Sequence, residues 1–369
     1  MRVVIVSYYG KVNSPSLWSG TPKNIRDHLT KISNLEIEEL FVLRSQFVHR
    51  LLMGLEIIFN FWPKRSILRT LISSFMILFY IFMKDQKEAI FLHLEPVGYI
   101  PRRLSKRRKI QHYLFLDSTV IQWFDVSESG VRASKKSKSI QIWKENRIFT
   151  IFEGFFPISK KAYNSLIEDY EVEPSKIKLI RTGCGIKVTD APLIHDSEAV
   201  DEDTIRVLTI AKVEHWRKGV DLILQAAQES HAANIHFDLV LGKKYLSSAI
   251  ANVTFHNFLP SAQLSNLYFN SDVFVLPCRF EPYGLVFLEA VRANLPIVAT
   301  VESGLVVDLY DMGWPVIFAE QNSLSVIQSI LRSNSVLTKV KELDKVRDNI
   351  LARFDWEKMS QEMVAEWKL

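Results

Sequence analysis

The stretch DVFVLPCRFEPYGLVFLEAVRANLPIVAT, residues 272–300, decides the fold class of this 369-residue chain. It begins with the apolar run 272–277, passes through a short loop into the helical pattern of 284–294, and ends with the apolar run 296–300. Two continuous apolar runs joined by a helix are typical of parallel strands that are buried on both faces. The stretch therefore predicts a strand-helix-strand unit of an α/β sheet.

The same alternation continues through the rest of the chain. In the second half, further strands are predicted at 205–211, 237–242 and 252–259, and a helix at 219–230. In the first half, strands are predicted at 2–9, 37–43, 89–95, 112–119 and 176–186, and helices at 21–32 and 159–170. Thr21 is predicted to cap the helix 21–32, with Pro22 in its first turn. Two such alternations predict two doubly wound α/β domains.

The predicted boundaries follow from a change in composition. Residues 1–189 form the N-terminal domain, the acidic segment 190–203 is the linker, and residues 204–354 form the C-terminal domain. Residues 355–369 form a last helix with an apolar stripe that needs a docking surface, made of Trp356, Met359, Met363 and Trp367.

Charge is divided unevenly between the halves. Residues 1–189 contain 30 Lys and Arg against 17 Asp and Glu, a net charge of +13, whereas residues 190–369 have a net charge of −8. The basic half is expected to meet an anionic partner. The two cysteines cannot form a disulfide framework and the N-terminal apolar run is too short for a signal peptide, so a cytoplasmic location is expected.

Two glutamates within the opening stretch need partners. Glu281 and Glu289 are surrounded by apolar residues, and only Arg279 and Arg292 lie close by in sequence. Their spacing, roughly 10–12 Å along a helix, is too long for the carboxylate pair of a retaining glycosidase. The helix N-terminus between them favours an anion. An elongated ligand with hydroxyls at both ends and phosphate in the middle, such as a nucleoside diphosphate sugar, fits this pattern.

A basic loop supports the same ligand. In AKVEHWRKG (211–219), Lys212 and Lys218 bracket the loop that follows the strand 205–211. Cations at the carboxyl end of a parallel strand suit phosphate binding, although a solvated charged loop is an equally simple interpretation.

These segments carry a family resemblance. RFEPYGLVFLEAVRANLPIVAT (279–300) and AKVEHWRKG resemble the E-x7-E and basic-loop motifs of the retaining glycosyltransferases of family 4, the group 1 glycosyltransferases. WSGTP (18–22) and LPSAQLSNLYFNSDVFVLP (259–277) are similar to two further segments of that family, in the same order. The resemblance implies the GT-B fold, in which two doubly wound Rossmann-like domains face each other across a cleft and the last helix crosses back to the N-terminal domain.

The resemblance also implies roles for individual residues. Glu281 would hold the donor sugar, Glu289 the ribose, and Gly20 would close on the donor from the other domain. The diphosphate would be bound by the amides of Gly284, Leu285 and Val286 and by the basic side chains of Lys212, Arg217 and Lys218. Asp117 would lie near the reacting centre, or would simply cap the turn after its strand. Ala211 and Lys212 stand where the family usually has Gly-Arg, which leaves the identity of the donor open.

The implied reaction is a retaining, metal-independent transfer of a hexose from a nucleoside diphosphate sugar to a hydroxyl of a glycan or lipid-linked acceptor, with no cofactor. The alternatives are a GT-B epimerase or phosphorylase, or a catalytically degenerate scaffold. The sequence DED (201–203) lies in the predicted linker, so no metal ligation is expected there.

The basic half also raises the question of a membrane. Residues 70–83 carry no charge, but 14 residues are too few to span a bilayer. RRLSKRRK (102–109) contains six basic residues, which predict either a solvated basic surface or attraction to anionic lipid or a phosphorylated acceptor. No motif for reading nucleic acid accompanies this charge. Peripheral contact with the inner face of an anionic membrane is therefore predicted.

Overall fold

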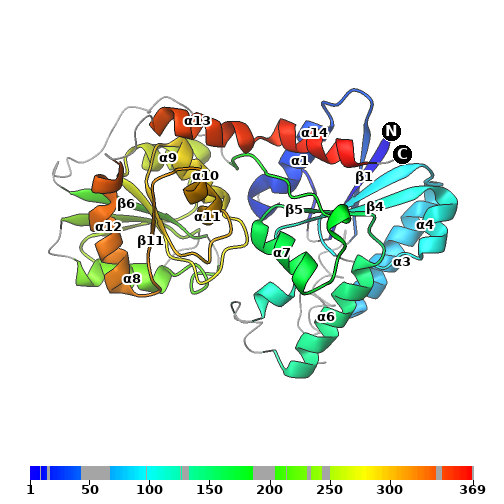
Figure 1. Ribbon diagram of the computed structural model, residues 1–369, viewed down its shortest axis with the longest axis horizontal. Coiled ribbons are helices and arrows are strands. Elements are labelled where there is room, and N and C mark those ends of the chain that lie inside the picture. Colours follow the sequence, from blue (N-terminus) through cyan, green and yellow to red (C-terminus); the bar gives the residue numbers. More distant parts are fainter. Residues whose placement is uncertain are drawn as a thin grey trace. The chain divides into compact units, whose positions relative to one another are not determined.

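The chain divides into two compact units. The computed structural model describes residues 1–8, 10–14, 17–42, 67–96, 98–124, 126, 133–185, 204–212, 214–230, 234–242, 250–337 and 343–367. Unit 1 comprises residues 1–182 and 355–369, and unit 2 comprises residues 183–354. Each unit is built on one parallel sheet (Figure 1). The predicted linker, residues 190–203, lies outside the described residues.

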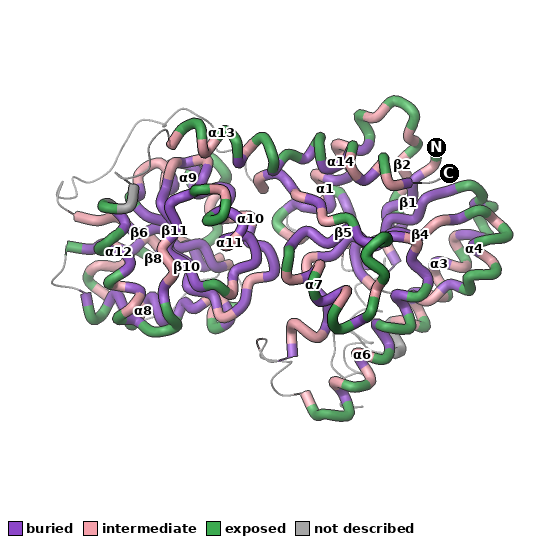
Figure 2. Tube along the Cα trace, viewed as in Figure 1, coloured by how far each residue is buried: buried purple, intermediate pink, exposed green. Residues whose placement is uncertain are grey.

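Unit 1 contains a five-stranded sheet in the order β2-β1-β3-β4-β5. The strands are β1 (Arg2–Ser7), β2 (Glu36–Phe41), β3 (Ala89–His93), β4 (Ile110–Leu116) and β5 (Gly154–Pro157). All pairings are parallel. The apolar residues of β1 and β3 are fully buried, as expected where helices cover both faces of a sheet, and Figure 2 shows β1 as a buried strand.

The helices of unit 1 are α1 (Thr21–Leu29), α3 (Ile67–Met83), α4 (Arg102–Arg108), α6 (Lys135–Phe149), α7 (Lys160–Glu168) and α14 (Trp356–Glu366). On one side of the sheet, Ile77 and Ile81 of α3 and Ile148 of α6 join a core that includes Val4 and Phe91. Helices α3 and α6 are thereby fixed to the sheet by apolar side chains.

The last helix, α14, belongs to unit 1. It packs against α1, and its apolar stripe is buried at Trp356, Met359 and Met363. The Tyr113 hydroxyl of β4 donates to the Glu366 carbonyl at 3.0 Å, which ties the end of α14 to the sheet.

Unit 2 contains a six-stranded parallel sheet in the order β11-β10-β9-β6-β7-β8. Its strands are β6 (Ile205–Ile210), β7 (Ile235–Val240), β8 (Val253–His256), β9 (Val273–Leu276), β10 (Ile297–Ala299) and β11 (Val316–Phe318). Its helices are α8 (Val220–Glu229), α9 (Ser261–Phe269), α10 (Leu285–Arg292), α11 (Val306–Asp311), α12 (Ser323–Leu337) and α13 (Leu343–Arg353).

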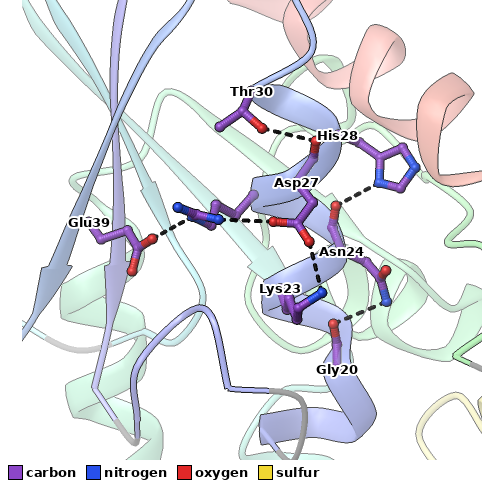
Figure 3. Close-up of polar contacts among 8 residues, drawn as sticks. Gly20, Lys23, Asn24, Asp27, His28, Thr30 and Glu39 are labelled. Atoms are coloured by element: carbon purple, nitrogen blue, oxygen red, sulfur yellow. Dashed lines mark hydrogen bonds and ion pairs between the residues drawn. The ribbon is translucent and has the colours of Figure 1, made fainter.

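The prediction that Thr21 caps the first helix is wrong. Gly20 is the N-cap residue, with φ 84°, and it follows Trp18 and Ser19, which also have positive φ. This left-handed turn delivers the chain directly into the helix at Thr21. Figure 3 shows the Asn24 amide donating to the Gly20 carbonyl at 3.1 Å, which fixes the first turn of α1.

Two further predictions need correction. Residues 176–185, the described part of the predicted strand 176–186, do not form a regular strand. They run beside β5 with one bridge, between Ile177 and Phe155, and the N–H groups of Lys178 and Ile180 donate to the Phe155 and Pro157 carbonyls at 2.9 and 3.0 Å. The apolar pattern of this segment arises because Ile177 and Ile180 are buried. The short strands β5 and β11 were not predicted.

Candidate active site

The candidate active site lies where the strand order of unit 2 reverses. Strands β6 and β9 are neighbours, but the chain continues from β6 to β7 on one side and from β9 to β10 on the other. Open parallel sheets bind ligands at the carboxyl ends of such a pair. The loop 211–219 follows β6 and the loop 277–284 follows β9, so both predicted motifs converge on this point.

The two loops are in direct backbone contact. Gly219 has φ 70°, and a Cβ atom there would lie 2.2 Å from the Pro277 carbonyl oxygen, so only glycine allows this approach. The Arg279 N–H donates to the Arg217 carbonyl at 2.8 Å. The basic loop is therefore held against the end of β9.

Glu281 is the centre of a buried ion cluster. Its Oε2 atom lies 3.3 Å from Lys218 Nζ and 3.3 Å from Arg217 Nη1. Burial alone would raise the pKa of the Glu281 carboxyl, but the charges of Lys218 and Arg217 outweigh it and hold that pKa below its ordinary value. Arg279, which is closer in sequence, pairs instead with Asp221.

Arg217 fixes the geometry of this cluster. Its guanidinium also bonds Glu214 Oε2 at 2.6 Å and the Phe280 carbonyl at 2.5 Å, and the residue is 6% exposed. Burial would lower the Arg217 pKa, but the neighbouring carboxylates of Glu281 and Glu214 raise it. Arg217 therefore stays charged and holds Glu281 in place.

The N-terminus of α10 lies next to this cluster. Gly284 is its N-cap residue, with φ 86°. Within the part of the chain that the structure describes, the N–H groups of Gly284, Leu285 and Val286 make no backbone hydrogen bond. Such free amides, together with the helix dipole, favour an anion.

Glu289 lies in the second turn of α10 and is 3% exposed. The Tyr268 hydroxyl of α9 donates to its Oε2 atom at 2.8 Å. Burial raises the Tyr268 pKa well above its ordinary value, and the nearby Glu289 carboxylate raises it further. Burial, reinforced by Glu289, likewise raises the pKa of Cys184 to about 11. Neither Tyr268 nor Cys184 was predicted to lie beside Glu289, because nothing in the local pattern around either residue indicates such a contact.

Lys212 has a different neighbour from Lys218. Its ammonium lies 5.4 Å from the centre of the Phe258 ring, and no contact between described residues joins it to Glu281. The structure therefore unites Lys218, Arg217 and Glu281, but places Lys212 beside an exposed aromatic ring.

The remaining predicted residues, Gly20 and Asp117, belong to unit 1. Asp117 follows β4, and its carboxylate accepts a hydrogen bond from Ser118 at 2.9 Å.

A further residue of unit 1, Glu95, was not predicted as a site residue. It follows β3. The Tyr8 N–H, which follows β1, donates to Glu95 Oε2 at 3.0 Å, so a buried carboxylate lies where the strand order of unit 1 reverses.

Among the residues that the structure describes, no group of three or more His, Cys, Asp or Glu side chains could hold a metal ion.

Comparison with known proteins places these motifs in a family. Residues 204–333 match the family model described as glycosyl transferases group 1. An uncharacterized glycosyltransferase of Methanocaldococcus jannaschii is 25% identical over 165 residues, which are 40% of this chain and 42% of that protein. Mannosylfructose-phosphate synthase of Agrobacterium fabrum is 26% identical over 279 residues, 59% of this chain and 60% of that protein. The chain thus spans about half the length of these relatives.

The fold has close counterparts among solved structures. WaaG, described as a glycosyltransferase involved in lipopolysaccharide biosynthesis, superposes with a TM-score of 0.63 at 15% identity, covering 100% of this chain and 96% of that chain. The two parallel-sheet units confirm the predicted pair of Rossmann-like domains. Residues 204–333 therefore match the group 1 glycosyltransferases, in a chain that has the GT-B fold.

Proposed function

We propose that the protein transfers a hexose from a nucleoside diphosphate sugar to a hydroxyl of a glycan or lipid-linked acceptor, with retention of configuration and without a metal ion. The observation that carries the proposal is the cluster of Lys218, Arg217 and Glu281 beside the free amides of α10. It combines groups that recognise phosphate with a carboxylate that can accept hydrogen bonds from sugar hydroxyls.

Each group has a distinct task in this reaction. The amides of Gly284, Leu285 and Val286 and the ammonium of Lys218 stabilise the charge that develops on the diphosphate as its bond to the sugar breaks. Glu281 orients the sugar through its hydroxyls, while Arg217 holds the Glu281 carboxylate. Both contacts from the cations go to Oε2 of Glu281, which leaves Oε1 for the sugar.

The acceptor proton needs no protein base in this proposal. An oxygen of the departing diphosphate takes the proton on the face that it leaves, so the acceptor attacks that same face. Asp117 and Glu95, at the carboxyl ends of strands in unit 1, are the candidate residues for binding the acceptor. A lipid-linked acceptor would bring the enzyme to the inner face of an anionic membrane.

Nucleotide binding and product analysis test the proposal. A thermal-shift panel of nucleoside diphosphates and their sugars should contain at least one ligand that raises the melting temperature, because a ligand that binds only the folded state stabilises it. The stabilising sugar nucleotide is then incubated with and without acceptors. Transfer to an acceptor with retention supports the proposal; epimerised donor without acceptor, or no ligand at all, refutes it.

A further inference from the structure

Helix α3 is apolar on the side that faces away from the protein. Its inward row is buried against the sheet at Ser73, Ile77 and Ile81. Its outward row, here called the α3 stripe, consists of side chains that are 51 to 68% exposed, namely Leu71, Phe75, Phe79, Phe82 and Met83. A helix on a protein surface normally presents polar residues on its outer face, so the α3 stripe requires an explanation.

The α3 stripe is continuous and lies along the helix axis. The rings of Phe75 and Phe79 stack with their centres 6.2 Å apart. Contiguous exposed apolar patches on soluble folds mark interaction sites. No helix in the described part of the chain is long and apolar enough to cross a bilayer. A helix with one apolar face in the protein and another outside it suits an interface between lipid and water.

Helix α4 borders one end of the α3 stripe. The Arg108 guanidinium lies 4.9 Å from the centre of the Phe82 ring, and its NH1 group bonds Asp85 at 2.9 Å, just after α3. Arg103, Lys106 and Arg107, here called the α4 cations, are exposed and form no ion pair with any residue in the described ranges. A group of open cations therefore lies beside an open apolar face.

An exposed apolar face beside exposed cations favours one kind of partner, an anionic bilayer. Lipid headgroups with negative charge attract exposed cations, and the acyl region below them accepts apolar side chains. A second copy of the chain would instead bring like-charged α4 cations near each other. We propose that the α3 stripe and the α4 cations form one docking surface for an anionic bilayer, with α3 lying in the plane of the interface.

This inference rests on the membrane contact in the proposed function, but its test needs neither donor nor acceptor. Co-sedimentation with phosphatidylcholine vesicles, with and without phosphatidylglycerol, is measured while salt rises from about 0.05 M to about 0.5 M. Circular dichroism and thermal unfolding check that unit 1 of each variant is folded, and nucleotide binding measured by thermal shift checks unit 2. Failure of vesicle binding with intact nucleotide binding would thus contradict the docking surface alone.

Two variants separate the two parts of the surface. Replacing the α4 cations by Gln should weaken binding to anionic vesicles about 100-fold at low salt. The F75S/F79S variant should still bind at low salt but should detach completely at high salt, where the wild type stays partly bound by insertion. The matched controls, Gln at Lys31, Arg353 and Lys358, and Ser at the exposed α12 residues Leu324 and Leu331, should bind like the wild type.

A tryptophan probe identifies the occupant of the α3 stripe. Because the chain already has eight tryptophans, the emission of the wild type is subtracted from that of the F79W variant. This difference emission should shift to the blue only when anionic vesicles are added, because the added indole then leaves water. Three results would overturn the proposal: wild type that does not bind anionic vesicles, both surface variants binding like the controls, or emission already blue-shifted without lipid. In the last case, sedimentation velocity distinguishes a second copy from coverage by the chain's own residues.

Discussion

The protein contains two basic clusters that look alike in sequence but differ in structure. In the loop 211–219, Arg217 is buried and bonded to Glu214 and Glu281, and Lys218 contacts Glu281. On α4, Arg103, Lys106 and Arg107 are exposed. The two clusters differ in the polar group that faces them. The loop after β9 places the Glu281 carboxylate against the first cluster, whereas the buried polar residue of α4 is the uncharged Ser105. Cations that are paired within the protein, such as Arg217, position other side chains. Exposed cations without such a pair among the described residues, such as Arg107, are available to bind an external anion.

The largest effect should follow from removing the buried cation. Arg217→Met should reduce the free energy of unfolding by about 3–5 kcal/mol, because the largely buried Glu281 would keep only Lys218 as a partner among the described residues and the Phe280 carbonyl would lose its donor. Chemical denaturation checks this, with Arg107→Met on α4 as control, where a change below about 0.5 kcal/mol is expected. Equal losses in the two variants would show that the clusters do not differ.

Removing the neighbouring cation should affect catalysis instead. Lys218→Ala should lower kcat about 10²–10³-fold, since stabilisation of the departing diphosphate is lost in the transition state. Steady-state kinetics at saturating donor measure it. A change confined to KM would mean that Lys218 binds only the ground state. Lys106→Ala serves as control and should leave kcat with a soluble acceptor unchanged.

Glu289→Ala should weaken binding of nucleoside diphosphates, with or without sugar, by about 10–100-fold, as expected for loss of hydrogen bonds to a charged group. Calorimetry with UDP and GDP measures the affinity. Tyr268→Phe, which removes only the hydroxyl that bonds Glu289, should have a smaller effect in the same direction. Unchanged affinity in Glu289→Ala would remove the proposed ribose contact.

The smallest effect is expected from chelation. If Lys218 and the α10 amides supply the positive potential at the diphosphate, EDTA should leave turnover unchanged. Activity that falls with EDTA and returns with Mg²⁺ or Mn²⁺ would show that an ion shares this task.

Local patterns predicted the strands of both sheets except the short edge strands β5 and β11, and they predicted the helix that begins after Gly284, because continuous apolar runs and a glycine cap are short-range signals. They could not predict which side chains meet. Arg217 and Glu281 are 64 positions apart, and only the adjacency of β6 and β9 joins them. The exposure of the α3 stripe was equally hidden: a helix that is apolar all round does not indicate which face the protein covers.

The contact that joins α4 to the sheet, between Ser105 and His112 of β4, makes unit 1 sensitive to acid. Ser105 Oγ lies 3.0 Å from His112 Nε2, and His112 Nδ1 lies 3.0 Å from His93 Nε2. Burial lowers the pKa of His112 to about 3 and lowers that of His93, which the neighbouring His112 depresses further. Folded unit 1 therefore binds fewer protons than the unfolded chain below pH about 6.5. The contribution of His93 and His112 to the free energy of unfolding is fully present above that pH and is lost as the pH falls towards 3. When both imidazoles are charged, the facing nitrogens His93 Nε2 and His112 Nδ1 both become donors and their hydrogen bond is lost. Acid should therefore loosen α4, and with it the edge of the α3 stripe, through protonation of the core rather than of the surface.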